Sequence, residues 1–128
     1  MTIDLQYLVL TVGLTFIQVV VATLLSLGQA SLPQLAGNRE SLEPFTGIAG
    51  RAHRAHRNML ESLVLFAVLV LVAHVAGKAN ANTALGAMIF FWARLAYGVI
   101  YIAGIPWLRT LAWAVSVLAL VLIFTQLF

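Results

Sequence analysis

Four long apolar stretches constrain this chain more than any other feature. A helix needs about 20 apolar residues to cross the hydrocarbon core of a bilayer. Four segments qualify: Leu5 to Leu27, Arg51 to Ala76, Thr83 to Ile105 and Trp107 to Phe128. Only 9% of the residues are charged, whereas soluble domains contain about 25%. The sequence therefore predicts an all-α integral membrane protein, a bundle of four transmembrane helices that forms one domain over residues 1–128.

The composition also excludes several classes of function. A net charge of +3 from seven basic residues leaves no charged surface that could follow a nucleic-acid backbone. The absence of cysteine excludes a disulfide, a thiolate metal site and a cysteine nucleophile. His53, His56 and His74 do not pair with a carboxylate at the spacing of a metal site. No metal is therefore predicted.

The connections and the basic residues predict the orientation. The first connection is long, Gly28 to Gly50, the second is the polar turn Gly77 to Asn82, and the third turns at Gly104 and Pro106. We expect Gly77 to end one helix, Asn82 to cap the next and Pro106 to begin the fourth. The first and third connections and the adjoining helix starts carry Arg39, Arg51, Arg54, Arg57 and Arg109, and the opposite side carries only Lys78. The positive-inside rule then places both connections in the cytosol and both termini outside.

Polar side chains are concentrated on one face at the start of the second span. At 100° per residue, a single face about 120° wide holds Arg51, Arg54, Arg57, Asn58 and Glu61, and Arg57 and Glu61 are spaced to pair. An anchor whose arginines reach the headgroups would explain the arginines. It would not explain Asn58 and Glu61, because a carboxylate followed at once by an apolar run is costly in lipid. This face therefore indicates a polar functional site.

The third span repeats the pattern. Arg94, Tyr97 and Tyr101 are spaced i, i+3, i+7 and share one face. Arg94 lies about 17 Å from the Thr83 end and so needs an anion within the membrane. Glu61 is the acid that could meet it at that depth. Two interpretations stay open: an Arg94–Glu61 pair that ties the two helices together, or a ligand role for Arg94.

The fourth span begins with a third polar pair, Arg109-Thr110. Unpaired backbone N–H groups and the helix dipole favour anions there, and the arginine adds a full charge. Alone, Arg109 is best explained as an interfacial arginine. Together, the three clusters suit a small, flexible anion with amide and amine groups beside an apolar partner that enters from the lipid.

These motifs resemble one membrane family. The run in the second span resembles the signature of the MAPEG proteins, membrane-associated proteins in eicosanoid and glutathione metabolism: Arg54-Ala55-His56-Arg57-Asn58-x-x-Glu61. The family includes microsomal glutathione transferases, microsomal prostaglandin E synthase and leukotriene C synthase. The third-span motif Arg94-x-x-Tyr97-x-x-x-Tyr101 is most similar to the leukotriene synthase branch. The pair Arg109-Thr110 resembles the Arg-Ser pair of the prostaglandin branch.

The resemblance implies a short, bacterial-type homotrimer in the inner membrane, with glutathione bound as co-substrate between subunits. Activity would consist of attack by the glutathione thiolate on a lipophilic electrophile or hydroperoxide. By resemblance, the residues that bind glutathione are Arg54, Arg57, Asn58, Glu61, Arg94 and Thr110. Those that act on the sulfur are Arg109, Tyr97 and Tyr101. The chain departs from glutathione-using members after the first span, where Gly28-Gln29-Ala30-Ser31 lacks a basic residue.

Two other functions stay open. One is a lipid-binding or scaffold protein without enzyme activity, as the family's five-lipoxygenase-activating member is; Arg109 and the complete second-span motif count against it. The other is a four-span cation transporter, which needs a carboxylate near the middle of a helix. The first span offers only Gln18, and Glu61 is surrounded by arginines, so this function is disfavoured.

Overall fold

The computed structural model describes residues 1–39 and 42–128. Within these residues the chain is all-helical and contains no strand. Four helices are long and apolar enough to cross a membrane, so the protein is a multi-pass membrane protein. The helices are α1 (Ile3–Ser26), α2 (Leu32–Ala36), α3 (Gly47–Val75), α4 (Ala81–Ala103) and α5 (Pro106–Thr125).

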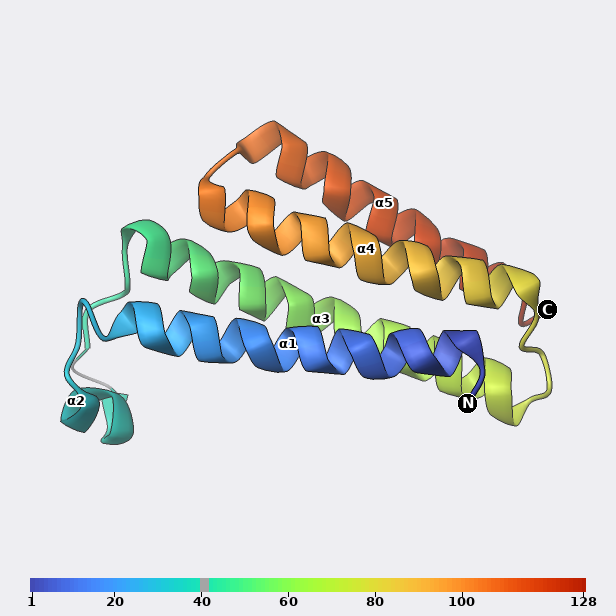
Figure 1. Ribbon diagram of the computed structural model, residues 1–128, viewed down its shortest axis with the longest axis horizontal. Helices are drawn as coiled ribbons and strands as arrows, with labels where there is room; N and C mark the ends of the chain where they lie inside the picture. The colour runs from blue at the N-terminus through green and yellow to red at the C-terminus, as the bar shows by residue number, and fades with distance from the viewer. Residues whose placement is uncertain (40–41) are drawn as a thin grey trace.

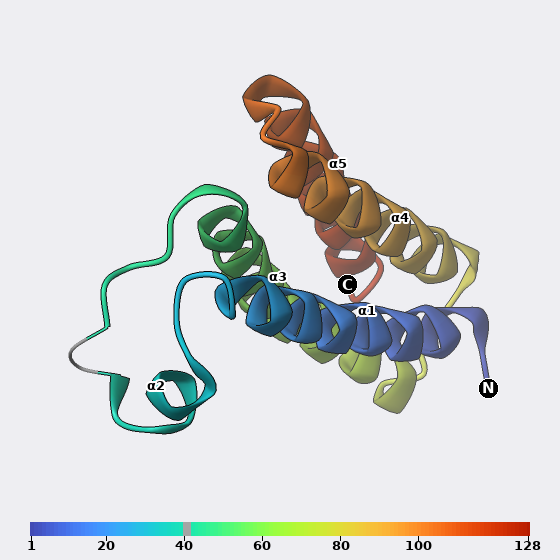
Figure 2. The same ribbon diagram turned by 60° about the vertical axis from the view of Figure 1, so that its left-hand side comes forward.

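The four long helices run roughly along one axis (Figure 1). Both termini lie at one end, and α2 and the turn between α4 and α5 lie at the other. Helix α4 contacts all three other long helices, whereas α5 packs mainly on α4 and touches α3 only slightly. Figure 2 shows that α4 and α5 lean away from α1 and α3 at the end where they turn. We call this end, which carries Arg51, Arg54, Arg57 and Arg109, the arginine-rich end.

The helix ends differ from the predicted ones for local reasons. Helix α3 begins at Gly47, four residues before Arg51, and Gly47 itself has a φ of +60°. The second turn is capped by Asn80 and not by Asn82: the Asn80 side chain accepts the backbone N–H of Thr83, whose hydroxyl in turn bonds the Asn80 backbone. The predicted Asn82 cap is therefore wrong, because this reciprocal box satisfies two backbone donors at once.

The other predicted ends are found. Gly77 follows the end of α3 with a φ of +68°, and Pro106 begins α5 two residues after the left-handed Gly104. The short helix α2 was not predicted. Its signal is the capping box between Ser31 and Gln34, which the long connection's proline and glycines obscured.

The hydrophobic core lies away from the arginine-rich end. Phe66 of α3 stacks on Phe90 of α4 with ring centroids 4.2 Å apart, and both are fully buried. Val70 and Ile123 complete the centre of this cluster. The helices therefore pack tightly around this cluster, and they diverge at the arginine-rich end, where the polar residues meet.

Helix α1 turns its small and polar side chains inward. The buried residues recur at helical spacing and include Thr11, Thr15 and Ser26, whose hydroxyls donate to carbonyls one turn earlier. Gln18 lies on the same face against Gly98 of α4. Outward-facing side chains on α1 are large and apolar, for example Phe16 and Leu24. This arrangement suits a helix whose outer face meets lipid.

Contact between α4 and α5 depends on Gly86. A Cβ added there would lie 2.6 Å from Cγ1 of Ile123 and 3.1 Å from the carbonyl oxygen of Ala119. We expect Gly86→Ala to lower the free energy of unfolding in detergent by about 1–3 kcal/mol, because a packed interface must open. Gly13→Ala is the matched control: it is helical with nothing within 4 Å, so alanine should raise stability by up to about 1 kcal/mol. Equal effects of the two substitutions would contradict the role of Gly86.

Candidate functional site

Arg94 is the most deeply buried charge in the described chain. Its side chain has no exposed surface, and its Nη2 donates to Oδ1 of Asn58 at 2.7 Å. Its guanidinium also lies over the Tyr97 ring, 4.2 Å from the centroid. Nε and Nη1 are buried without a hydrogen-bond partner among the described residues. Asn58 and Tyr97 thus hold Arg94 between α3 and α4, with two donors left unsatisfied.

The predicted pairs of Glu61 are not found. Among the described residues, Glu61 has no ion pair with Arg94 or Arg57 and no hydrogen bond, and its side chain is exposed. The amide of Asn58 replaces it as the partner of Arg94. Asn58 lies one helical turn nearer the arginine-rich end than Glu61. The tether between α3 and α4 therefore exists, but with a neutral acceptor.

Tyr101 brings three helices together at the arginine-rich end. Its hydroxyl accepts a hydrogen bond of 3.1 Å from Nε of Arg54 on α3. The guanidinium of Arg109 on α5 lies over its ring, 4.5 Å from the centroid. Because the hydroxyl oxygen accepts from Arg54, its own proton is free to donate to another group. The structure thus places Arg54, Tyr101 and Arg109 in one cluster, as the sequence predicted they could be.

Tyr97 and Tyr101 lie one turn apart on α4, and their aromatic rings are in contact. Their rings meet edge to face with centroids 5.5 Å apart. Tyr97 is 5% exposed, whereas Tyr101 is half-buried. The buried Tyr97 ring is therefore covered by Arg94. Tyr101 is partly accessible and lies between Arg54 and Arg109.

Three other polar residues at the arginine-rich end make contacts of their own or are exposed. The Thr110 hydroxyl donates to the carbonyl of Pro106 in its own helix, and its side chain is exposed. Arg57 is exposed and lines a hollow beside the first connection. Arg51 donates through Nε to the carbonyl of Ile102. Arg51 thus caps the end of α4, a structural role that its position on the polar face did not reveal.

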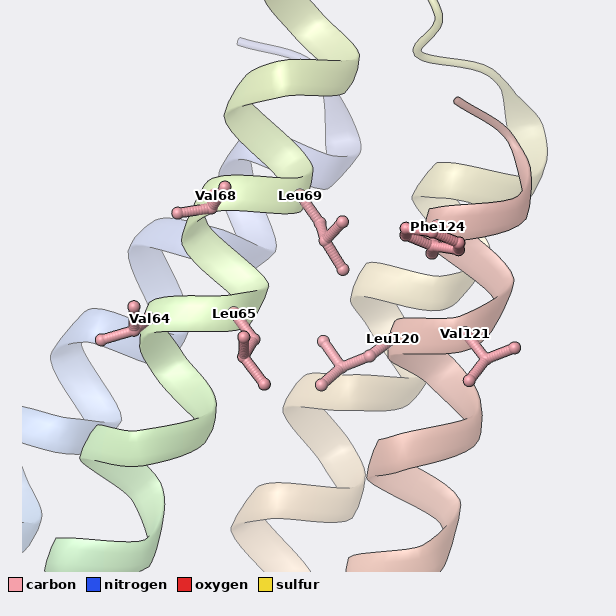
Figure 3. Close-up of a pocket in the computed structure, with 7 residues that line it drawn as sticks. All are labelled: Val64, Leu65, Val68, Leu69, Leu120, Val121 and Phe124. Atoms are coloured by element: carbon pink, nitrogen blue, oxygen red, sulfur yellow. The ribbon is translucent and has the colours of Figure 1, made fainter. Parts of the chain in front are cut away.

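A polar hollow lies beside this cluster, between α3 and α5. Its volume is about 170 Å³, and Asn58, Glu61 and Trp113 line it. It shares Leu65 and Leu120 with a larger apolar groove of about 370 Å³. In Figure 3, Leu65 and Leu69 of α3 face Leu120 and Phe124 of α5 across that groove. A hollow with polar lining residues thus adjoins an apolar groove between the same two helices.

Comparison with protein-family models identifies the family. The model of the MAPEG family matches residues 5–128, nearly the whole chain. The chain belongs to the MAPEG family. The resemblance inferred from the motifs is thereby confirmed. Comparisons with curated proteins and with solved structures gave no match.

In this MAPEG protein one contact was missed from the sequence. Gln29 holds Thr46 by two hydrogen bonds: its Nε2 donates to the Thr46 carbonyl at 2.8 Å, and its Oε1 accepts the Thr46 N–H at 2.9 Å. Gln29 lies in the stretch Gly28 to Ser31, where the resemblance led us to expect a basic residue. Its amide fastens the first connection to the start of α3, and no sequence pattern signals such a long-range amide pair.

Proposed function

We propose that this protein is a glutathione-dependent membrane transferase or peroxidase. It would hold the glutathione thiolate for attack on a lipophilic electrophile or hydroperoxide. MAPEG membership is consistent with glutathione-related or lipid-metabolic roles. The observation that carries the proposal is the meeting of Arg54, Tyr101 and Arg109, from three helices, at one accessible hydroxyl.

The chemistry of this cluster suits a thiolate. Glutathione supplies a thiol, which with a pKa near 8.5 is mostly protonated at neutral pH. Arg109 stands in the first turn of α5, where its charge and the helix dipole both favour an anion. The Tyr101 hydroxyl, with its proton free, can donate to the sulfur. This geometry favours Tyr101 over the buried Tyr97 as the residue that orients the sulfur.

The remaining motif residues fit the peptide part of glutathione. Arg54 and Arg57 are exposed cations suited to carboxylates, and Glu61 is an exposed anion suited to the α-amine. Arg94 is fully buried, so we assign it a positioning role: it orients the Asn58 amide and the Tyr97 ring. Thr110 would contribute through its backbone near the helix start, since its hydroxyl already bonds Pro106.

The apolar groove supplies a place for the lipophilic substrate. It runs between α3 and α5 and joins the polar hollow at Leu65 and Leu120. A molecule dissolved in the bilayer could enter the groove and present its reactive atom at the hollow. This arrangement explains why a conjugating enzyme would be built inside a membrane.

Glu61 supports the proposed homotrimer with sites between subunits. It lies about 21 Å from the Val75 end of α3, and so within the hydrocarbon core. An exposed carboxylate at that depth does not face lipid. A neighbouring subunit over α3, together with the glutathione amine, would cover it. We place the protein in the bacterial inner membrane, with the arginine-rich end in the cytosol.

Binding is tested by thermal or chemical unfolding of the detergent-solubilised protein with glutathione. At 100 times its dissociation constant, glutathione should raise the free energy of unfolding by about 2.7 kcal/mol. Arg57→Ala should remove most of this gain, whereas Lys78→Ala, at the opposite end of α3, should retain it. Absence of stabilisation at millimolar glutathione would contradict the proposal.

A further inference from the structure

A second polar hollow lies at the arginine-rich end, beside the cluster around Tyr101, with which it shares Arg54. Its volume is about 420 Å³. It forms between the first connection and the start of α3, and we call it the loop pocket. Its lining residues are Arg39, Pro44, Phe45, Gly50, His53, Arg54 and Arg57. Four of these residues recur on α3 at i, i+3, i+4 and i+7, so they share one face.

The wall of the loop pocket is held in place by specific contacts. The Phe45 ring stacks on His53 with centroids 4.7 Å apart, and the His53 ring nitrogen bonds the buried Ser26 hydroxyl of α1. A Cβ at Gly50 would lie 2.5 Å from the Phe45 carbonyl oxygen. Glycine at this position therefore lets the connection lie directly on α3. The double hydrogen bond between Gln29 and Thr46 fastens the same wall.

The described residues that line the loop pocket carry charge of one sign only. Three guanidinium groups and one imidazole line it, and no described lining residue is a carboxylate. Arg39 donates through Nε to the Leu35 carbonyl at 2.8 Å, which directs the side chain and leaves its terminal nitrogens to donate elsewhere. Arginines in this arrangement match the several acceptor oxygens of a phosphate group.

The length of α3 places the loop pocket at the headgroup level. Its 29 residues span about 44 Å, which exceeds the hydrocarbon thickness of about 30 Å. If the apolar end at Val75 meets the far interface, the 20 residues 56–75 fill the core. The first nine residues of α3, which include Gly50, His53 and Arg54, then lie beside the lipid headgroups.

We propose that the loop pocket binds the phosphate group of an anionic membrane phospholipid. A diffusing lipid presents its phosphodiester at this level, where basic pockets attract anionic headgroups. A headgroup without a cation is favoured, since the choline group of a zwitterionic lipid would meet three guanidinium groups. The loop pocket shares Arg54 and Arg57 with the proposed glutathione site. The inference goes beyond the proposed function because Arg39 and His53 belong to no part of that site, and Arg39 therefore distinguishes lipid binding from glutathione binding.

The test uses the full chain in a neutral detergent, titrated with phosphatidylglycerol, phosphatidylcholine, inorganic phosphate and glutathione in separate arms. Arg39→Gln should weaken phosphatidylglycerol binding about fivefold, and Arg39→Lys should retain most of it. Lys78→Gln, which removes the one lysine at the opposite end, is the matched control and should change nothing. Glutathione binding should be equal in all four proteins.

Each contrary result has a distinct meaning. Equal weakening by Arg39→Gln and Lys78→Gln would show general charge attraction and would overturn the site. Phosphatidylcholine binding as tight as phosphatidylglycerol binding would overturn the preference for anionic lipid. Inorganic phosphate that binds as tightly as the lipid would show that the pocket serves a free anion. Loss of glutathione binding in Arg39→Gln would place the pocket in the glutathione site, whereas failure of glutathione to bind the unaltered protein would overturn only the proposed function.

Discussion

Arg109→Ala is expected to slow glutathione conjugation by about 100-fold or more and to leave glutathione binding nearly unchanged. Removal of one preorganised donor from an anion site typically costs a factor of about 10²–10³ in rate. Arg109 is partly buried, lies over the Tyr101 ring and stands in the first turn of α5. Its charge therefore acts where the sulfur would be held, and not at Arg57, which we assign to a peptide carboxylate.

The measurement combines turnover with a direct signal of the thiolate. Conjugation to a generic aromatic electrophile gives the rate, and the ultraviolet absorbance of bound thiolate against pH gives the ionisation. In Arg109→Ala the thiolate should appear only at higher pH. Arg109→Lys should be a partial substitute, because it keeps the charge and loses the planar fork. Lys78→Ala should behave like the unaltered protein.

The same measurement separates the enzyme from a scaffold of the same fold. If the unaltered protein binds glutathione but shows no thiolate below pH 8 and no turnover with electrophiles or hydroperoxides, the transferase proposal fails. The apolar groove between α3 and α5 would then be the main functional feature. A lipid-binding MAPEG protein without enzyme activity would be the better description.

The long helices and the polar faces could be predicted because they depend on local periodicity. Apolar runs longer than a bilayer crossing determine the four spans. The i, i+3, i+7 spacing of Arg94, Tyr97 and Tyr101 determines that they share a face whatever the partner helix is. The meeting of Arg54 with Arg109 at Tyr101 follows from these faces and from their common end of the bundle.

The partners across helices could not be predicted in the same way. Asn58 and Glu61 lie about 60° apart on α3, and the rotation of α3 against α4 decides which of them meets Arg94. That rotation depends on packing by buried side chains such as Met59 and Phe66. Formal charge led us to predict Glu61 as the partner of Arg94, but the packing of α3 against α4 places Asn58 beside Arg94. The loop contacts of Gln29 and Phe45 depend in the same way on how the connection folds back.

Asn58→Leu is expected to lower the free energy of unfolding of the ligand-free protein by about 3 kcal/mol. The substitution keeps the number and branching of the side-chain heavy atoms and removes the one hydrogen-bond acceptor that Arg94 has among the described residues. A fully buried guanidinium would then lack any acceptor, and loss of one partner of a buried charge is far costlier than loss of an exposed one. Reversible unfolding in mixed micelles gives the measurement.

Two variants make this prediction specific. Glu61→Gln, one turn further along α3, should change ligand-free stability by no more than about 0.5 kcal/mol, because Glu61 has no ion pair or hydrogen bond among the described residues and its proposed partner, the glutathione amine, is then absent. Arg94→Met combined with Asn58→Leu should recover most of the loss, since replacing both partners by apolar groups leaves no buried donor unsatisfied. If instead Glu61→Gln were the more damaging single change, the buried charge of Arg94 would depend on the carboxylate. The contact between Arg94 and Asn58 would then not be what joins α3 to α4.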